Sequence, residues 1–307
     1  MAHHNLGEFE SLRPRLFGIA YRMLGVVADA EEVVQEAFLR WQQTTEALRS
    51  DEAWLVSVAT RIAIDRLRRA ESERAAYRGG WLPAPVATPP PDRDTELADD
   101  LSLGFLLMLE RLTPEERAAF LLREVFDTEY AEIARTLDKT EAACRQLVHR
   151  AKQHVRRRRR RAQVAPDVRK RLARRFVEAL RAEDRDGVLA LLTDDALLAA
   201  DGGGRVPSIP ETQHGAERVA QLLVGFERAT RAELARRTSL RQEHDVVWLN
   251  GEPAVLTMAD GKLLFATILH LEGDRIAAMY RVLNPSKLAG LGFKTFLEPD
   301  STAGRVS

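Results

Sequence analysis

The sequence is poor in cysteine, net charge and long apolar runs, and each shortage excludes a class of protein. Its 307 residues include one cysteine, Cys144, so an intrachain disulfide is impossible and we expect a reducing compartment. No stretch approaches about 18 consecutive apolar residues, which argues against a membrane-spanning helix. The first residues also lack the pattern of a signal peptide. We therefore expect a cytoplasmic protein with no membrane partner.

Motifs of the common catalytic sites are missing as well. The chain has no zinc-protease H-E-x-x-H, no G-x-S-x-G, no P-loop and no dinucleotide fingerprint, and its seven histidines lack metal-ligand spacing. We expect no enzyme activity, no catalytic residue, no metal and no cofactor. Cys144 adjoins an inward helix position, which favours a structural thiol over a nucleophile. The glycines that follow Asp201 favour a turn over an anion-binding nest.

The formal net charge is zero, but the charges are placed unevenly. Residues 145–175 hold 14 Lys and Arg residues against one acid, Asp167, so this stretch carries +13 and the rest of the chain −13. A basic block of this kind favours binding to a polyanion. The alternative is a solvated, self-repelling helix end, with the six arginines 156–161 as an unrelated tail.

Residues 6–78 have helical periodicity without strand-like alternation. A first helix ends before Gly25, and Asp29, three residues before Glu32, predicts the cap of a second. The inward stripe of the second helix is Val33, Val34, Ala37, Phe38 and Trp41. A polar loop over residues 43–51 leads to a third helix that ends near Arg69. This segment is predicted to be a helical domain.

Residues 79–98 contain five of the 13 prolines and predict an extended linker. Residues 99–162 are helical again, with a capping box at 113–116 and a further cap at Asp127 or Thr128. Two helices separated by a break at 138–140 predict a helix-turn-helix. The second of these helices presents Arg145, His149 and Lys152 at i, i+4 and i+7, beside Gln146, Arg150 and Gln153. Such a face suits the major groove of DNA.

Residues 167–295 differ from the preceding helical segments because they combine helical and strand patterns. Amphipathic helices come first, one of them over residues 188–192, followed by the glycine turn at 201–205 and a third helix. Turn dipeptides at 250–251, 260–261 and 273–274 then separate four expected strands, at 246–249, 253–258, 263–271 and 276–283. This order predicts a small α+β domain. Residues 296–307 are expected to form a flexible tail.

Several motifs resemble those of a known protein family. The motifs AYRMLG (20–25), DAEEVVQEAFLRW (29–41), AWL (53–55) and IDRLR (64–68) are similar to region 2 of bacterial extracytoplasmic-function sigma factors. LTPEER (112–117), YAEIA (130–134) and VHRA (148–151) resemble region 4. WLPAP (81–85), DGGGR (201–205) and NPSKL (284–288) resemble signatures of the subgroup with a fused SnoaL-like domain.

The resemblance implies a multidomain fold: a region 2 helical bundle, a region 4 helix-turn-helix and a C-terminal NTF2-like α+β cone. It implies binding to core RNA polymerase, at the β′ clamp helices and the β flap, and to promoter DNA. The implied polymerase-binding residues are Asp29, Glu32, Gln35, Glu36 and Leu39.

Promoter contacts follow from the same resemblance. The residues implied at the −10 element, where a flipped base is captured, are Thr44, Thr45, Arg49, Trp54, Arg61, Arg66, Arg68 and Arg69. Those implied at the −35 element are Lys139, Thr140, Glu141, Arg145, Gln146, His149, Arg150 and Lys152.

The fused domain is expected to modulate activity in cis, through contacts between the linker and the cone. The residues implied are Trp81, Leu82, Pro83, Asp201, Gly202, Gly203, Gly204, Arg205, Asn284, Pro285, Lys287 and Leu288. The cone also offers room for an unidentified small-molecule ligand.

Two other functions remain open. One is a one-component regulator that senses a ligand in the cone and binds its operator without polymerase. The other is an enzyme of the polyketide-cyclase type, for which Asp201, His214, Asp245 and His270 are the available titratable groups. Specific initiation with core polymerase distinguishes the three.

Overall fold

The computed structural model describes residues 6–45, 48–75, 77, 79–91, 101–155, 164–237 and 240–296. The chain divides into two compact units. The helical unit comprises Met1–Ala76 and Phe105–Arg159, and the α+β unit comprises Tyr77–Gly104 and Arg160–Ser307. The arginine run at 156–161 and the expected tail, apart from Phe296, lie outside the described residues. No described helix is long and apolar enough to cross a membrane.

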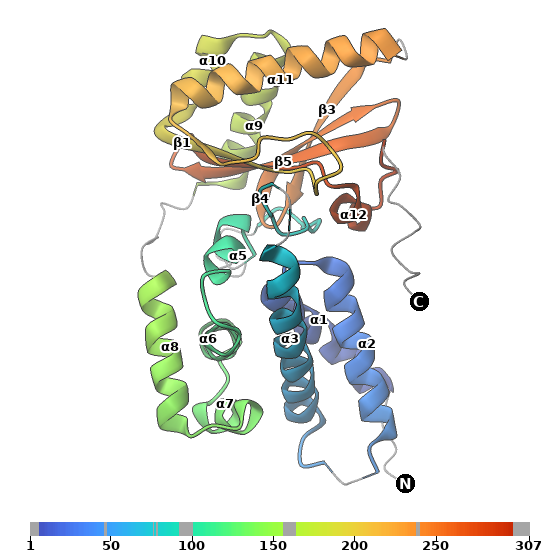
Figure 1. Ribbon diagram of the computed structural model, residues 1–307, viewed down its shortest axis with the longest axis vertical. Helices are drawn as coiled ribbons and strands as arrows, with labels where there is room; N and C mark the ends of the chain where they lie inside the picture. Colours follow the sequence, from blue (N-terminus) through green and yellow to red (C-terminus); the bar gives the residue numbers. More distant parts are fainter. Residues whose placement is uncertain are drawn as a thin grey trace. The chain divides into compact units, whose positions relative to one another are not determined.

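Three long helices open the helical unit: α1 (Leu6–Leu24), α2 (Val27–Gln43) and α3 (Asp51–Ala75) (Figure 1). They pack on one another because each has one apolar face. The buried side chains at their centre include Leu16, Ile19, Met23, Val33, Val34, Trp41, Leu55 and Ile62. The inward stripe predicted for α2 is therefore confirmed, with Phe38 partly buried.

The helical unit continues with α5 (Leu103–Leu109), α6 (Pro114–Phe120), the π-helical turn Leu121–Val125, α7 (Tyr130–Leu137) and α8 (Glu141–Val155). The predicted capping box is present, because the Thr113 hydroxyl accepts from the Glu116 amide and the Glu116 carboxylate accepts from the Thr113 amide. Asp138, with φ 53°, ends α7 and opens the tight turn before α8. The predicted helix-turn-helix is confirmed.

The α+β unit places α9 (Pro166–Arg181), α10 (Arg185–Leu189) and α11 (Ala216–Arg237) against a six-stranded sheet (Figure 1). The strands are β1 (Leu192–Asp201), β2 (Gln213–His214), β3 (Gln242–Leu249), β4 (Glu252–Ala259), β5 (Lys262–Glu272) and β6 (Arg275–Val282). They follow the order β2-β1-β6-β5-β4-β3. A short helix, α12 (Pro285–Leu288), and the 3-10 turn Ala289–Leu291 come after β6. The predicted α+β class is confirmed.

The four predicted strands form an antiparallel meander, in which β3 begins four residues before its predicted range and the other three differ from theirs by one residue at each end. Positive φ values at Asn250, Gly251, Asp260 and Gly261 provide the tight turns that the dipeptides predict. The core lies between the sheet and its helices, where Leu172, Phe176, Leu180, Leu223 and Met279 are buried together. One face of the sheet thus forms the interior of the cone.

Strand β1 was not predicted, and the helix expected at 188–192 ends earlier, at Leu189. The sequence of β1, LTDDALLAAD, is rich in Ala and Leu and has no aromatic residue, so its local propensity disfavours a strand. Parallel pairing with β6, from Leu197 opposite Ala278 to Asp201 opposite Val282, overrides that propensity. Residues far along the chain therefore decide this element.

Two predicted helix caps are wrong. Helix α2 begins at Val27 with Val26 as its cap residue, so Asp29 lies in the first turn instead of capping it. Helix α7 is capped by Glu129 rather than by Asp127 or Thr128. Acidic side chains remain favourable in a first turn through the helix dipole, which explains why the pattern resembled a cap.

Candidate functional site

The outward face of α2 combines an apolar side chain with polar neighbours. Leu39 is 48% exposed, and Glu32 and Gln35 are exposed beside it. Arg66 of α3 holds Glu32 at 2.6 Å and Glu36 at 3.4 Å. Exposed leucine in an acidic surface is suited to docking on a basic, partly apolar partner. Of the predicted polymerase-binding residues, Glu32, Gln35 and Leu39 are therefore accessible, whereas Asp29 and Glu36 are partly buried.

Five of the eight residues predicted for the −10 element line one of two pockets. Arg49, Trp54 and Arg61 line a pocket of about 660 Å³, whose other wall comes from residues 127–136. Arg66 and Arg69 line a smaller recess of about 260 Å³ beside Arg40. Thr44 caps α2 through its hydroxyl, which donates to the carbonyl of Arg40 at 3.0 Å. Thr45 is exposed in the loop.

Two of these arginines are engaged by the helix-turn-helix half of the helical unit. Arg61 donates from Nε to the carbonyl of Thr136 and from Nη2 to that of Arg135, both at 2.8 Å. Arg68 pairs with Glu115 at 2.5 Å. The carbonyl groups at the C-terminus of α7 attract a cation because they carry partial negative charge. In this arrangement, Arg61 is occupied by protein groups.

Helix α8 presents the predicted basic face. Cys144, Val148 and Ala151 are buried, while Arg145, Gln146, His149 and Arg150 are exposed. Thr140 caps the helix by accepting from the Ala143 amide at 3.2 Å, and Lys139 precedes it in the exposed turn. Burial raises the pKa of the Cys144 thiol, which is consistent with a structural role.

Several predicted −35 residues also form ion pairs within the protein, among them Arg150, which lies 3.9 Å from Glu116. Arg145 bonds Glu141 at 3.1 Å, and Lys152 bonds Glu124 at 2.6 Å. The exposed pair of Arg145 and Glu141 contributes little to stability, so Arg145 can exchange it for a contact with DNA at little cost. The face is therefore free to exchange its partners.

The three motifs that resemble the fused-domain signatures converge on one buried ion pair in the α+β unit. Asp201 is fully buried, and Lys287 of α12 lies 2.6 Å from its Oδ2. The same Oδ2 accepts from the Leu82 amide at 3.0 Å, and Lys287 donates to the Leu82 carbonyl at 2.6 Å. The Lys287 ammonium also lies 4.4 Å from the centroid of the Trp81 ring. We call this group of contacts the linker anchor.

Tyr77 and Asn284 complete the linker anchor. Asn284 was among the predicted residues, whereas Tyr77 was not. Tyr77 donates its hydroxyl to Asp201 Oδ1 at 2.6 Å and accepts from Asn284 Nδ2 at 2.9 Å. Burial raises the pKa of Tyr77 above its ordinary value, and the hydrogen bond to Asp201 raises it further. Tyr77 precedes the proline-rich stretch and belongs to no motif, so no local signal identified it.

The glycine turn serves the same anchor. Gly203, with φ 65°, donates its amide to Asp201 Oδ1 at 2.9 Å, and a Cβ at this position would meet the side chain of Asn284 at 2.5 Å. Gly202 is buried, and Gly204 and Arg205 are exposed. The anion that the turn faces is the carboxylate of the same chain. The predicted turn is confirmed, and Pro83, Pro285 and Leu288 of the other two motifs are buried.

A second attachment holds the linker further along. Asn250, in the left-handed turn between β3 and β4, accepts from the Val86 amide through Oδ1 and donates its own amide to the Val86 carbonyl, both at 2.9 Å. Its Nδ2 donates to the carbonyl of Leu101 at 2.9 Å. Sequence reasoning assigned Asn250 only to a turn. The described part of the linker is thus held at Leu82 and at Val86, and Leu101 is held shortly after it.

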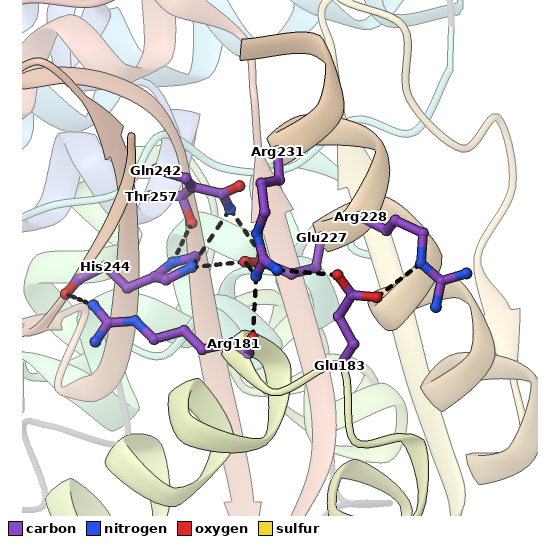
Figure 2. Close-up of polar contacts among 8 residues, drawn as sticks. All are labelled: Arg181, Glu183, Glu227, Arg228, Arg231, Gln242, His244 and Thr257. Atoms are coloured by element: carbon purple, nitrogen blue, oxygen red, sulfur yellow. Dashed lines mark hydrogen bonds and ion pairs between the residues drawn. The ribbon is translucent and has the colours of Figure 1, made fainter. Parts of the chain in front are cut away.

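The interior of the cone holds a polar cluster that the sequence did not reveal (Figure 2). Glu227 of α11 accepts from Gln242 Nε2 at 2.8 Å and lies 3.1 Å from His244 Nε2 and 3.3 Å from Arg231 Nη2. His244 Nδ1 lies 3.1 Å from the Thr257 hydroxyl. Burial pushes the pKa of Glu227 upward, but the hydrogen bond and charge of His244 bring it below its ordinary value. Glu227 is therefore well satisfied by its neighbours.

The four titratable groups considered for catalysis are not brought together. Asp201 belongs to the linker anchor, His214 and Asp245 are exposed on strands, and buried His270 contacts Glu252. Among the described residues, no hydrogen bond or ion pair joins any two of the four. In the same part of the chain, no group of His, Cys, Asp and Glu could hold a metal ion.

Comparison with known proteins gives a consistent picture. Residues 9–73 match the model of Sigma-70 region 2, and residues 102–155 match that of Sigma-70, region 4. The chain is 33% identical to the ECF RNA polymerase sigma factor SigJ of Mycobacterium tuberculosis, covering 94% of this chain and 95% of that protein. It is 31% identical to the probable ECF sigma factor SigI of the same species, over 90% and 92%. The crystal structure of SigJ aligns with a TM-score of 0.72 and 31% identity, covering 93% of this chain and 99% of that one.

Proposed function

The chain belongs to the extracytoplasmic-function sigma factors, which direct RNA polymerase to promoters, and we propose that its fused α+β domain controls this activity through the linker anchor. The family membership implies core RNA polymerase and promoter DNA as partners. The observation that carries the regulatory part is the burial of Asp201 and Lys287 around the linker backbone.

The polymerase-binding part rests on the outward face of α2. Leu39 and its acidic neighbours dock on the β′ clamp helices, and the helix-turn-helix half binds the β flap. Leu39 suits this role because it is one of the few large apolar side chains exposed in the described part of the chain. A few large side chains buried at the centre of an interface usually account for most of the binding free energy.

Core binding tests this part. Leu39→Glu is expected to weaken binding to core polymerase by about tenfold or more, because it places a charge in the desolvated centre of the interface. The matched control is Leu6→Glu, since Leu6 is 58% exposed on α1 and receives the same change. Affinity is measured by fluorescence anisotropy of the labelled full chain. Equal affinities for the two variants would remove α2 from the interface.

The DNA-binding part has two modules. Arg49, Trp54 and Arg61 border a pocket large enough for an extruded base, and Arg66, Arg68 and Arg69 hold the backbone of the opened strand. Arg145, Gln146, His149, Arg150 and Lys152 face the −35 major groove, with Lys139, Thr140 and Glu141 at its start. Use of Arg61 on DNA requires it to leave the carbonyl groups of α7.

Regulation follows from where the linker is held. The linker connects the region 2 and region 4 segments in sequence, and its contacts with the α+β unit are intramolecular, so they form at high effective concentration. Releasing the linker therefore changes the freedom of the two DNA-binding segments. The fused domain acts in this way without being an enzyme, and a small molecule in the cone is the proposed signal.

Transcription from a cognate promoter tests the regulation. Gly80 lies so close to β1 that a Cβ would meet the carbonyl oxygen of Ala200 at 2.8 Å, so Gly80→Ala displaces the linker. We expect this variant to change promoter-specific output with core polymerase by at least about threefold. Gly225→Ala is the control, because a Cβ there meets nothing within 4 Å.

The outcomes separate the alternatives. Output equal to wild type in Gly80→Ala contradicts regulation through the linker. Specific operator binding without polymerase, combined with no binding to core polymerase, would instead support the one-component regulator.

A further inference from the structure

The α+β unit holds an apolar pocket of about 460 Å³. Its walls come from the second half of α11, the start of β5 and the segments on either side of the linker anchor. Leu234, Leu263, Phe265, Leu283 and Phe296 form much of the lining. This volume and composition are typical of a site for one small organic molecule.

A buried cation lies next to this pocket. Arg281 of β6 is 7% exposed, and its guanidinium carbon lies 4.6 Å from the centroid of the Phe265 ring and 5.5 Å from that of Phe226. Phe265 also lines the pocket, so its ring neighbours both the guanidinium and the apolar space. Leu283, two residues beyond Arg281 and just after the end of β6, lines the pocket as well.

Arg281 has no acidic partner of its own. Within the described part of the chain, no carboxylate lies within 4.0 Å of its guanidinium, and its hydrogen bond runs from Nε to the Thr267 hydroxyl at 3.2 Å. Glu227, the carboxylate whose charge acts on it, is held by His244, Gln242 and Arg231 (Figure 2). Burial lowers the pKa of Arg281 to about 10, so the group remains charged at neutral pH.

A buried charge without an ionic partner is costly, and a bound anion would offset that cost. The planar guanidinium presents paired N–H donors whose geometry matches a carboxylate. The adjoining pocket supplies space for an apolar body.

We propose that the cone binds a small carboxylic acid with an apolar chain or ring, its carboxylate directed at Arg281 and its apolar part in the pocket. This deepens the ligand part of the proposed function and rests on it for its regulatory meaning. Pro285 and Leu288 of α12 line the pocket, and Lys287 on the same short helix belongs to the linker anchor. A ligand in the pocket therefore contacts α12, the same helix whose Lys287 holds the linker. Binding is thereby coupled to the linker through one turn of helix.

Calorimetric titration of the full chain with decanoate tests the site, with decan-1-ol as the uncharged probe of equal length. We expect decanoate to bind one molecule per chain, at least about tenfold more tightly than decan-1-ol, because one charge-assisted contact is worth about that factor. Arg281→Met should abolish the difference between the two probes. Arg228→Met, an exposed α11 arginine paired with Glu183, should keep it.

A second variant covers the possibility that Arg281→Met fails to fold. Leu234→Trp fills the pocket from α11 and should reduce binding of both probes by about tenfold or more while circular dichroism stays unchanged. Equal affinity of wild type for the two probes overturns the proposal, as does undiminished decanoate binding by folded Arg281→Met.

Two further outcomes overturn it. One is that folded wild type binds neither probe. The other is that decanoate binds only when residues 297–307 are removed, which would make the chain's own terminal segment the occupant. None of these titrations uses polymerase, so their failure is distinct from an unchanged transcription output in Gly80→Ala.

Discussion

Two buried cations of the α+β unit, Lys287 in the linker anchor and Arg281 in the cone, are each 7% exposed, yet their surroundings differ. Lys287 has the Asp201 carboxylate and the Leu82 carbonyl at 2.6 Å each. Arg281 has two phenylalanine rings and one hydroxyl. The two cations are therefore equally buried, but only Lys287 forms a complete ion pair, whereas the ion pair of Arg281 is incomplete. A completed pair holds structure together, whereas an incomplete one is available to a ligand.

Loss of Lys287 should have the largest effect. Lys287→Met leaves the fully buried carboxylate of Asp201 without its cation, which is expected to lower the free energy of unfolding by about 3–5 kcal/mol. Urea denaturation followed by circular dichroism measures it, and the double variant with Asp201→Asn should recover part of the loss. A loss below about 1 kcal/mol in Lys287→Met would show that the pair does not stabilise the anchor.

Displacement of the linker should cost less. Gly80→Ala forces the backbone away from the Ala200 carbonyl, with an expected loss of about 1–3 kcal/mol and faster proteolysis between residues 79 and 91. Gly225→Ala on α11 should be neutral or slightly stabilising, because it replaces a helical glycine in open space. Equal proteolysis rates in the two variants would mean that the linker tolerates the added methyl group.

Removal of Arg281 should have the smallest effect on stability. Arg281→Met discards a desolvated charge along with one hydrogen bond and two ring contacts, so the free energy of unfolding is expected to change by no more than about 1 kcal/mol in either direction. The same denaturation experiment compares it with Lys287→Met. A loss as large as that of Lys287→Met would erase the distinction between the two cations.

Much of the helical unit could be predicted from the sequence because its signals are local. The stripe of α2, the capping box at 113–116 and the turn at 138–140 each lie within a few residues of the structure they produce. The outward positions of Leu39, Arg145 and His149 follow from the same periodicity. The assignment of individual residues to the polymerase, the −10 element and the −35 element came only with the family resemblance and stays a prediction.

The sequence by itself determined the helices, the meander turns and the motifs that meet in the linker anchor. Only the tertiary structure decided that β1 is a strand, that Tyr77 and Asn250 hold the linker, and that Glu227 and His244 face each other in the cone. The physical reason is separation along the chain. Periodicity and capping act over one or two helical turns, whereas these contacts join residues from 17 to 164 positions apart and depend on which surfaces folding brings together.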